Sequence, residues 1–494
     1  MEEIYNYLAT LIKYSLDNQM IENEDVTYIS NRLIAYFKLD KYVEAAPLDL
    51  SLEQTLDYLT SYAIKQGLIE ESQVNKEIFI DELMNIFLDR PSNIISKFNS
   101  YLNEDPVKAT DYFYSLNKAS NYIKTYRVNK DLKWKSSTKY GDLDITINLS
   151  KPEKDPKDIA AARNAVKSTY PACLLCKENE GYKGSLTSPS RANIRLIPIK
   201  LDNEDFYFQY SPYSYYNEHS IILNEIHKPM IIDEGVFIKL LDFIEMFPHY
   251  FIGSNADLPI VGGSILSHEH FQAGRYHFLM EDAKSIFDFK LDKFNVNASI
   301  LAWPLSVIRL HGKVKEDLVK ASSFILESWI KYEDKEANII AYTDGVRHNT
   351  ITPIARKNKN NEFELDLVLR NNLTSEDYPL GIYHPHPEYH HLKKENIGLI
   401  EVMGLAILPS RLKKEIEIIK DVLLKKTNDT SSISAHLDWV TYLQNKYEFN
   451  EDNVEKIIQE EIGQRFALIL EDSGVFKQSE EGIRFFKKFV TSLK

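Results

Sequence analysis

The segment Ser267–Gly274 places two histidines and a glutamine at alternate positions. His268, His270 and Gln272 are each separated by one residue, and on a β-strand that spacing puts all three side chains on one face. A neutral imidazole attacks phosphorus well, and the resulting phosphoryl-imidazolium is a good leaving group for a second step. A neighbouring amide can donate to the phosphate oxygen on which charge builds up. The segment therefore predicts covalent transfer of a phosphorus-containing group.

An attacking histidine needs a lone pair on one ring nitrogen and a proton on the other. A backbone carbonyl that accepts from the protonated nitrogen would fix this tautomer. Upstream, the run Val261-Gly262-Gly263-Ser264 offers backbone and hydroxyl donors of the kind found in a phosphate nest. A plain His-x-His metal site is the alternative. The metalloprotease pattern His-Glu-x-x-His does not fit, because His270 directly follows Glu269.

The two cysteines of the chain, Cys173 and Cys176, have the spacing of a metal-binding hook. Tetrahedral zinc needs two more ligands, and histidines must supply them because the sequence has no further cysteine. His219 and His268 are the candidates, and zinc bound by His268 would brace the strand that carries His270. The two cysteines could instead form a redox pair, but the βαβ unit that flanks such a motif is missing here. A pair of buried thiols is the other alternative.

Composition and net charge limit the classes of protein to which this sequence can belong. The 494 residues carry a net charge of −14, which excludes a broad nucleic-acid-binding surface because phosphate backbones require a basic face. The first residues lack the basic and apolar regions of a signal peptide, and no run of about 18 apolar residues occurs. We therefore expect a cytoplasmic protein without a membrane span or a disulfide framework.

The elements around the motif predict an α+β protein. Residues 1–130 are predicted to be helical, with a capping box at Ser51–Gln54. Apolar and polar residues alternate over 143–149, which is typical of a half-buried strand. Short strands separated by turns follow to about residue 425 and favour antiparallel sheets over a doubly wound sheet. Residues 426–494 are again predicted to be helical.

A second group of histidines lies in the segment His384–His391. It predicts either a second metal or substrate site or a solvated loop. Lys393 and Lys394 follow, directly before an apolar run that begins at Ile397. Lysines at the start of a helix oppose its dipole, so their placement suggests an anionic partner.

Taken together, these motifs resemble class II galactose-1-phosphate uridylyltransferases, the bacterial branch of a transferase group in the histidine-triad superfamily. The matching segments lie in order between residues 140 and 412. They are Leu143–Ser150, Tyr170–Tyr182, Gln209–Tyr213, Tyr216–His219, Gly262–Ser264, Ser267–Gly274, Trp303–Ser306 and Lys393–Gly404. The resemblance implies histidine-triad-like antiparallel sheets in two related halves, with helical extensions at both ends. The expected segments are 1–135 (helical), 136–290 (first half), 291–425 (second half) and 426–494 (helical).

The resemblance also implies a reaction. UDP-glucose and galactose 1-phosphate would give glucose 1-phosphate and UDP-galactose by a ping-pong route through a uridylylated histidine. By the motif, His270 is this nucleophile and Gln272 holds the phosphate. Transferases of the superfamily carry glutamine at this position, whereas triad hydrolases carry histidine. His268 matches a zinc ligand, together with Cys173, Cys176 and His219.

The resemblance extends to substrate binding and assembly. The expected substrate-binding residues are Asn255, Tyr210, Ser211, Gly263, Ser264, Lys394 and Glu401. Tyr210 and Ser211 differ from the Asn-Asp pair of the better-known class, and Glu269 stands where that class has proline. We expect a structural zinc ion, no organic cofactor, and a homodimer in which the neighbour completes the hexose site.

Two alternatives stay open. The first is another His-x-His-x-Gln nucleotidyltransferase or phosphorylase, for example one acting on dinucleoside polyphosphates. The second is a zinc-braced binding protein that has lost catalysis, against which the intact His270 and Gln272 argue.

Overall fold

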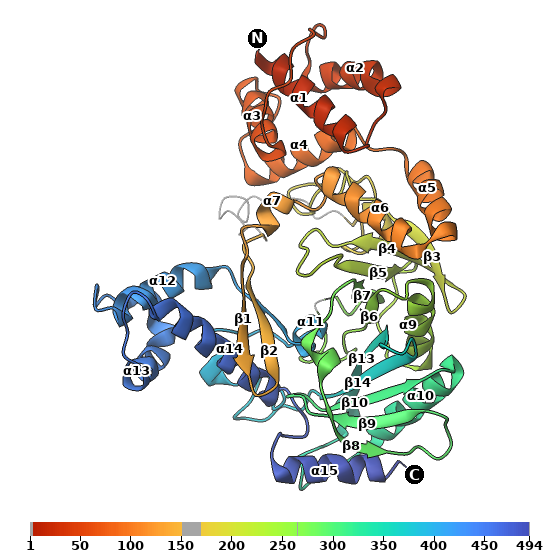
Figure 1. Cartoon of the computed structure of the whole chain (residues 1–494), viewed down its shortest axis with the longest axis vertical. Coiled ribbons are helices and arrows are strands. Elements are labelled where there is room, and N and C mark those ends of the chain that lie inside the picture. Colours follow the sequence, from red (N-terminus) through yellow and green to blue (C-terminus); the bar gives the residue numbers. More distant parts are fainter. Residues whose placement is uncertain (1–2, 151–168, 264, 494) are drawn as a thin grey trace. The chain divides into compact units, whose positions relative to one another are not determined.

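The computed structural model describes residues 3–150, 169–263 and 265–493 (Figure 1). Contacts divide the chain into two compact units. The first unit comprises Met1–Asn129, Ser150–Ser214 and Glu218–His227, and the second comprises Lys130–Leu149, Tyr215–Asn217 and Lys228–Lys494. Ser264, one of the expected substrate-binding residues, lies outside the described residues.

The first unit begins with the predicted helical region. Its helices are α1 (Glu3–Asp17), α2 (Val26–Phe37), α3 (Leu52–Lys65), α4 (Gln73–Asn85), α5 (Pro91–Glu104), α6 (Pro106–Ala119) and α7 (Thr125–Val128). The predicted capping box starts α3: Gln54 N donates to Ser51 Oγ over 3.2 Å, and Ser51 N donates to Gln54 Oε1 over 3.0 Å. These paired bonds satisfy two donors that the helix itself leaves free.

Three antiparallel strands complete the first unit, namely β3 (Ile197–Leu201), β4 (Glu204–Tyr210) and β5 (Ser220–Asn224). Phe208 of β4 packs edge to face against Phe98 of α5 and Phe113 of α6. Such aromatic contacts bury large apolar area, and they fix this sheet against the helical region of the same unit.

The second unit contains two sheets. The smaller one has the order β1 (Leu132–Thr138), β2 (Gly141–Ile147) and β15 (Leu405–Leu408). In the larger one, the strands of this unit run in the order β7 (His270–Gly274), β6 (Phe251–Gly253), β13 (Asn349–Lys357), β14 (Phe363–Asn371), β10 (Val307–Gly312), β9 (Asn297–Leu301) and β8 (Ser285–Phe289). The described pairings are antiparallel except for β15 with β2. A short ribbon joins β11 (Tyr342–Thr343) to β12 (Val346–Arg347).

Helices cover the strands of the second unit. Its helices are α9 (Glu234–Met246), α10 (Lys315–Lys331), α11 (Leu399–Val402), α12 (Arg411–Leu423), α13 (Leu437–Lys446), α14 (Val454–Asp472) and α15 (Glu480–Thr491). Both α9 and α10 pack on β13 (Figure 1), whereas α14 packs on β1. The prediction of an α+β protein with antiparallel sheets and helical ends is confirmed. The boundaries of the two related halves stay a prediction.

In the described part of the chain, no helix combines the length and the apolar character needed to cross a membrane.

Candidate active site

Strand β7 carries the motif with which the sequence analysis began. His270 and Gln272 are alternate residues of this strand, and His268 lies two residues before its first residue. His268 is fully buried, and His270 is 6% exposed. Gln272 is the most accessible position of β7. The strand therefore carries one buried imidazole and, two residues further on, a partly exposed glutamine whose Oε1 is buried.

The ring of His270 is oriented by its own backbone. His270 Nδ1 donates to the carbonyl oxygen of His268 over 2.7 Å. A proton on Nδ1 leaves the lone pair on Nε2, which is the tautomer that nucleophilic attack on phosphorus requires. Burial lowers the pKa of His270 below its ordinary value, and this keeps the imidazole neutral near pH 7.

The neighbouring strand β6 sets the position of Gln272. Gly253 of β6 is the register partner of Gln272. An added Cβ on Gly253 would approach Leu399 Cδ1 to 2.8 Å and Pro353 O to 3.0 Å, so only glycine fits there without displacement. Gln272 Oε1 makes no hydrogen bond within the described structure. Sequence reasoning missed Gly253, because a lone glycine in a short strand carries no sign of its partner.

Asn255 connects three segments around β7. Its Oδ1 accepts from Leu399 N over 2.9 Å, and an added Cβ on Gly263 would approach its Nδ2 to 2.6 Å. A Cβ on Gly262 would likewise approach Ala256 O to 2.5 Å. The two glycines of the run therefore permit close packing against residues 255–258, and this packing brings the backbone of Gly263 beside Asn255.

Glu401 lies on the short helix α11, which follows the lysine pair. Its Oε2 accepts from Gly398 N over 3.0 Å, and Lys393 Nζ is 2.5 Å from its Oε1. Lys393 is buried in this ion pair, whereas Lys394 is exposed. Nearby, Arg370 of β14 donates to Ile397 O over 3.0 Å. The structure thus fixes the Glu401 side chain, whereas the Lys394 side chain is exposed to solvent.

A cluster of possible metal ligands lies in the first unit. The ligand atoms of Cys173, Cys176 and His227 lie within 4.8 Å of one another. The two sulfurs are 3.5 Å apart, and Cys176 Sγ is 3.2 Å from His227 Nδ1. Leu175 N donates to Cys173 Sγ over 3.3 Å, and the Asn179 amide donates to both cysteine carbonyls over 2.8 Å. These bonds shape the hook, and we call the three ligands the Cys/His cluster.

His219, which the sequence analysis selected as a ligand, is not part of the Cys/His cluster. Its carbonyl accepts from Ser211 N over 2.8 Å, and burial lowers the pKa of its ring to about 3. Among the described residues of the first unit, His227 is the histidine in the cluster with the two cysteines. Both histidines follow the cysteines in sequence, and spacing alone does not distinguish them.

Tyr210 and Ser211 lie at the end of β4 in the first unit. The Tyr210 side chain is fully buried, and its hydroxyl donates to Thr110 O over 3.1 Å. It packs against the ring of Phe113. Ser211 Oγ accepts from Tyr213 N over 3.3 Å and is also buried. The structure therefore assigns the Tyr210 side chain to packing within the first unit.

Comparison with known proteins places this arrangement in a family. The model of the galactose-1-phosphate uridyl transferase N-terminal domain matches residues 19–229, and that of the C-terminal domain matches residues 243–440. The chain belongs to this family. It is 49% identical to the galactose-1-phosphate uridylyltransferase of Clostridium acetobutylicum, over 99% of this chain and 100% of the relative.

Further members of the family match along almost their whole length. The proteins of the same name from Clostridium perfringens strain 13 and Staphylococcus carnosus are 50% and 47% identical. These matches cover 98% of both chains for the first relative and 99% of both for the second. A crystal structure of yeast Ap4A phosphorylase Apa2 aligns with 67% of this chain and 95% of its own, at 12% identity and a TM-score of 0.34.

The histidine-rich segment His384–His391 shows no metal-ligand group among the residues that the structure describes and is not fully solvated, and its role as a substrate site stays a prediction. Within the described residues it forms no group with the spacing of metal ligands, and His384 and His391 are buried rather than solvated. His386 and His390 donate to the carbonyls of Ile382 and Pro385 over 3.1 and 2.9 Å. The imidazoles thus hold the segment's own backbone in shape.

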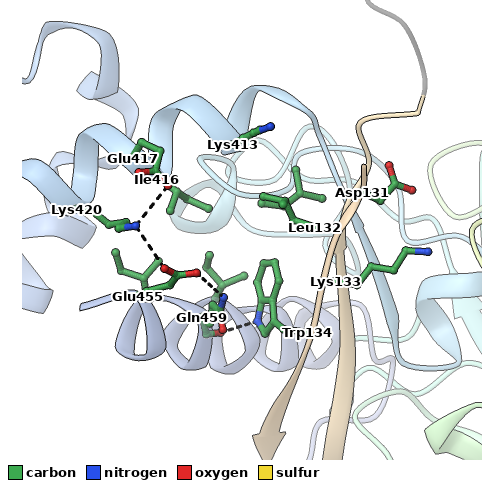
Figure 2. A pocket seen from close by; sticks show the side chains of 13 residues that line it. Asp131, Leu132, Lys133, Trp134, Lys413, Ile416, Glu417, Lys420, Glu455 and Gln459 are labelled. Atoms are coloured by element: carbon green, nitrogen blue, oxygen red, sulfur yellow. Dashed lines mark hydrogen bonds and ion pairs between the residues drawn. The ribbon is translucent and has the colours of Figure 1, made fainter. Parts of the chain in front are cut away.

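A pocket of about 380 Å³ lies elsewhere in the second unit, between β1, α12 and α14 (Figure 2). Lys420 of α12 reaches Glu417 and Glu455 in its wall, and Trp134 Nε1 donates to Gln459 O over 3.2 Å. The residues of β7 and α11 are not among those that line it. The family's motif therefore points to β7, and this pocket is separate from it.

Proposed function

We propose that this protein is a UDP-glucose–hexose-1-phosphate uridylyltransferase of galactose metabolism. It would convert UDP-glucose and galactose 1-phosphate into glucose 1-phosphate and UDP-galactose. The observation that carries the proposal is the ring of His270, whose Nδ1 donates to the His268 carbonyl and leaves Nε2 as the nucleophile. The support from relatives is that galactose-1-phosphate uridylyltransferases match 98–99% of this chain.

In the first half-reaction, His270 Nε2 attacks the phosphorus of UDP-glucose that bears the uridine. An N–P bond forms, and the P–O bond to glucose 1-phosphate breaks. The leaving sugar phosphate is a weak base and departs without a dedicated general acid. The bond from Nδ1 to the His268 carbonyl stabilises the positive charge that develops on the ring. The product is uridylyl-His270.

In the second half-reaction, a phosphate oxygen of galactose 1-phosphate attacks the same phosphorus. The N–P bond breaks, the electron pair returns to Nε2, and the neutral imidazole is restored. Gln272 serves both steps, because its amide can donate to a non-bridging oxygen while charge builds up there. Its partly exposed position on β7 supports this role.

Glu401 and Lys394 are proposed to bind the hexose phosphate. Each carboxylate oxygen of Glu401 can accept more than one hydrogen bond, so its bonds to Gly398 N and Lys393 leave capacity for a sugar hydroxyl. The exposed ammonium of Lys394 suits a phosphate. Asn255 and Gly263 would act at the same end of α11, where the Asn255 amide accepts from Leu399 N.

A structural zinc ion fits the Cys/His cluster. Zn–S bonds of about 2.3 Å in a tetrahedron place two sulfurs about 3.8 Å apart, close to the 3.5 Å observed. Burial raises the pKa of Cys176 to about 11, and a bound cation would stabilise the thiolate that this environment otherwise disfavours. Cys173, Cys176 and His227 would hold the metal, and His268 remains the further ligand that the sequence predicts. Zinc would supply only a structural crosslink.

The resemblance to the family further suggests a homodimer that works in the cytoplasm on UDP-sugars and hexose 1-phosphates. The net charge of −14 is compatible with such substrates, which require only a few local basic residues.

The decisive experiment traps the intermediate. Protein incubated with UDP-glucose alone should release one equivalent of glucose 1-phosphate per active site and retain uridylate on His270, as located by peptide mass spectrometry. His270→Ala should abolish both signals, while His277→Ala, a control at an exposed histidine, should leave them unchanged. The absence of an adduct, or its survival in His270→Ala, would refute the mechanism. Turnover with dinucleoside polyphosphates but not with galactose 1-phosphate would favour the alternative transferase.

A further inference from the structure

Glu269 separates the two histidines of the motif and is itself buried. It is 4% exposed. A buried carboxylate is costly unless charged or hydrogen-bonding groups compensate it, so its partners are informative.

Two lysines of the second unit compensate this carboxylate. Lys239 of α9 donates from Nζ to Glu269 Oε1 over 2.8 Å, and Lys239 is as deeply buried as Glu269. Lys228 Nζ lies 3.2 Å from Glu269 Oε2. The backbone adds a third link, because Glu269 N donates to Lys228 O over 2.7 Å. Glu269 is therefore fixed by its side chain and by its main chain.

The consequence follows from the geometry of one peptide group. The N–H of Glu269 and the carbonyl of His268 belong to the same peptide unit, which is planar. Its N–H end is held by Lys228 O, and its carbonyl end accepts from His270 Nδ1 over 2.7 Å. Whatever fixes this plane also fixes the direction in which the His270 ring is held.

We propose that Glu269, anchored by Lys239 and Lys228, is a positioning residue that holds the His268–Glu269 peptide plane and thereby orients His270 for attack. This inference rests on the proposed function, in which His270 is the nucleophile. Glu269 does not touch the reacting atoms. Its contribution is to keep Nε2 aimed at phosphorus and the proton on Nδ1.

Two single variants test the proposal. Glu269→Gln keeps the shape of the side chain but removes its charge, and Lys239→Met removes the buried cation. The matched control is Lys315→Met, which removes another lysine paired with α9, at 2.5 Å from Asp242. Denaturation curves and zinc content are measured for all three, so that loss of fold or metal is seen separately from loss of rate.

The functional measurement is the rate of glucose 1-phosphate release in a single turnover without galactose 1-phosphate. We expect Glu269→Gln and Lys239→Met to lower this rate about 10-fold to 100-fold, the cost of misplacing a reacting group by about 1 Å. The KM for UDP-glucose should stay within about two-fold, because the lost interaction acts on chemistry rather than on binding. Lys315→Met should match the unmodified protein in both quantities.

A spectroscopic measurement reports the tautomer directly. In protein labelled with ¹⁵N-histidine, His270 should show a protonated Nδ1 and an unprotonated Nε2, and Glu269→Gln should convert this pattern into a mixture. If Glu269→Gln does not fold, Lys239→Met serves in both measurements. The proposal would be overturned if Glu269→Gln and Lys239→Met had the same rate and the same His270 tautomer as Lys315→Met. It would also be overturned if their loss of rate accompanied a loss of zinc. If the unmodified protein released no glucose 1-phosphate, the proposed function would fail, while the tautomer measurement would still decide the positioning role.

Discussion

Replacement of Gly253 by alanine tests whether the packing between β6 and β13 holds Gln272 in place. The added Cβ would approach Leu399 Cδ1 to 2.8 Å, Pro353 O to 3.0 Å and Ile354 Cγ1 to 3.1 Å. The leucine can rotate away, but the carbonyl of Pro353 cannot, because it accepts from Ser254 N over 3.0 Å. Strand β6 must therefore shift, and such overpacking typically costs about 1–3 kcal/mol.

The functional effect follows from the strand pairing. Gly253 is opposite Gln272, so a shift of β6 displaces the amide that is proposed to bind the phosphate. We expect kcat to fall about tenfold, with a smaller change in the KM for UDP-glucose, because a donor used mainly in the transition state is misplaced. Urea denaturation and steady-state kinetics measure the two effects.

Gly312→Ala is the matched control, since Gly312 lies at the end of β10 and its nearest neighbour would be the flexible end of Leu318 at 3.2 Å. We expect it to change stability by less than about 1 kcal/mol and to leave kcat unaltered. If Gly253→Ala were as stable and as active as Gly312→Ala, the reasoning about β6 would be wrong.

Two further predictions concern the first unit. Two basic partners lower the pKa of Glu77 to about 2, against the opposing effect of burial. Its stabilising effect should therefore be complete above its ordinary pKa of 4.5 and should disappear as the pH falls towards 2. Urea denaturation should show Glu77→Gln to be less stable by about 2–3 kcal/mol at pH 7, with a difference that shrinks in acid, whereas Asp17→Asn in an exposed pair should differ little at either pH. The second prediction concerns the metal: His227→Ala should lower the zinc content of the purified protein, measured by elemental mass spectrometry, whereas His219→Ala should not. If His219→Ala lowered the zinc content and His227→Ala did not, the ligand set expected from the sequence would be correct.

Features that depend on neighbours in sequence could be predicted without the structure. The alternation of His270 and Gln272 follows from the period of a strand, and the contact of His270 Nδ1 with the His268 carbonyl spans only two residues. The capping box at Ser51 is equally local, since its two bonds join residues three apart. The family motifs are also contiguous. For these reasons the candidate nucleophile, the α+β class and the helical ends were all accessible from the residues alone.

The tertiary structure decided what depends on contacts between distant residues. Only the fold shows that His227, and not His219, lies in the cluster with the cysteines. Likewise, only the fold shows that the Tyr210 side chain is buried inside its own unit. In the same way, Lys239, one of the two lysine partners of Glu269, lies 30 residues away on α9. Residue types and their spacing indicate which chemistry a chain can perform, because they determine the reactive side chains and their local geometry. The surroundings that orient and desolvate those groups come from segments remote in sequence, and no local pattern encodes them.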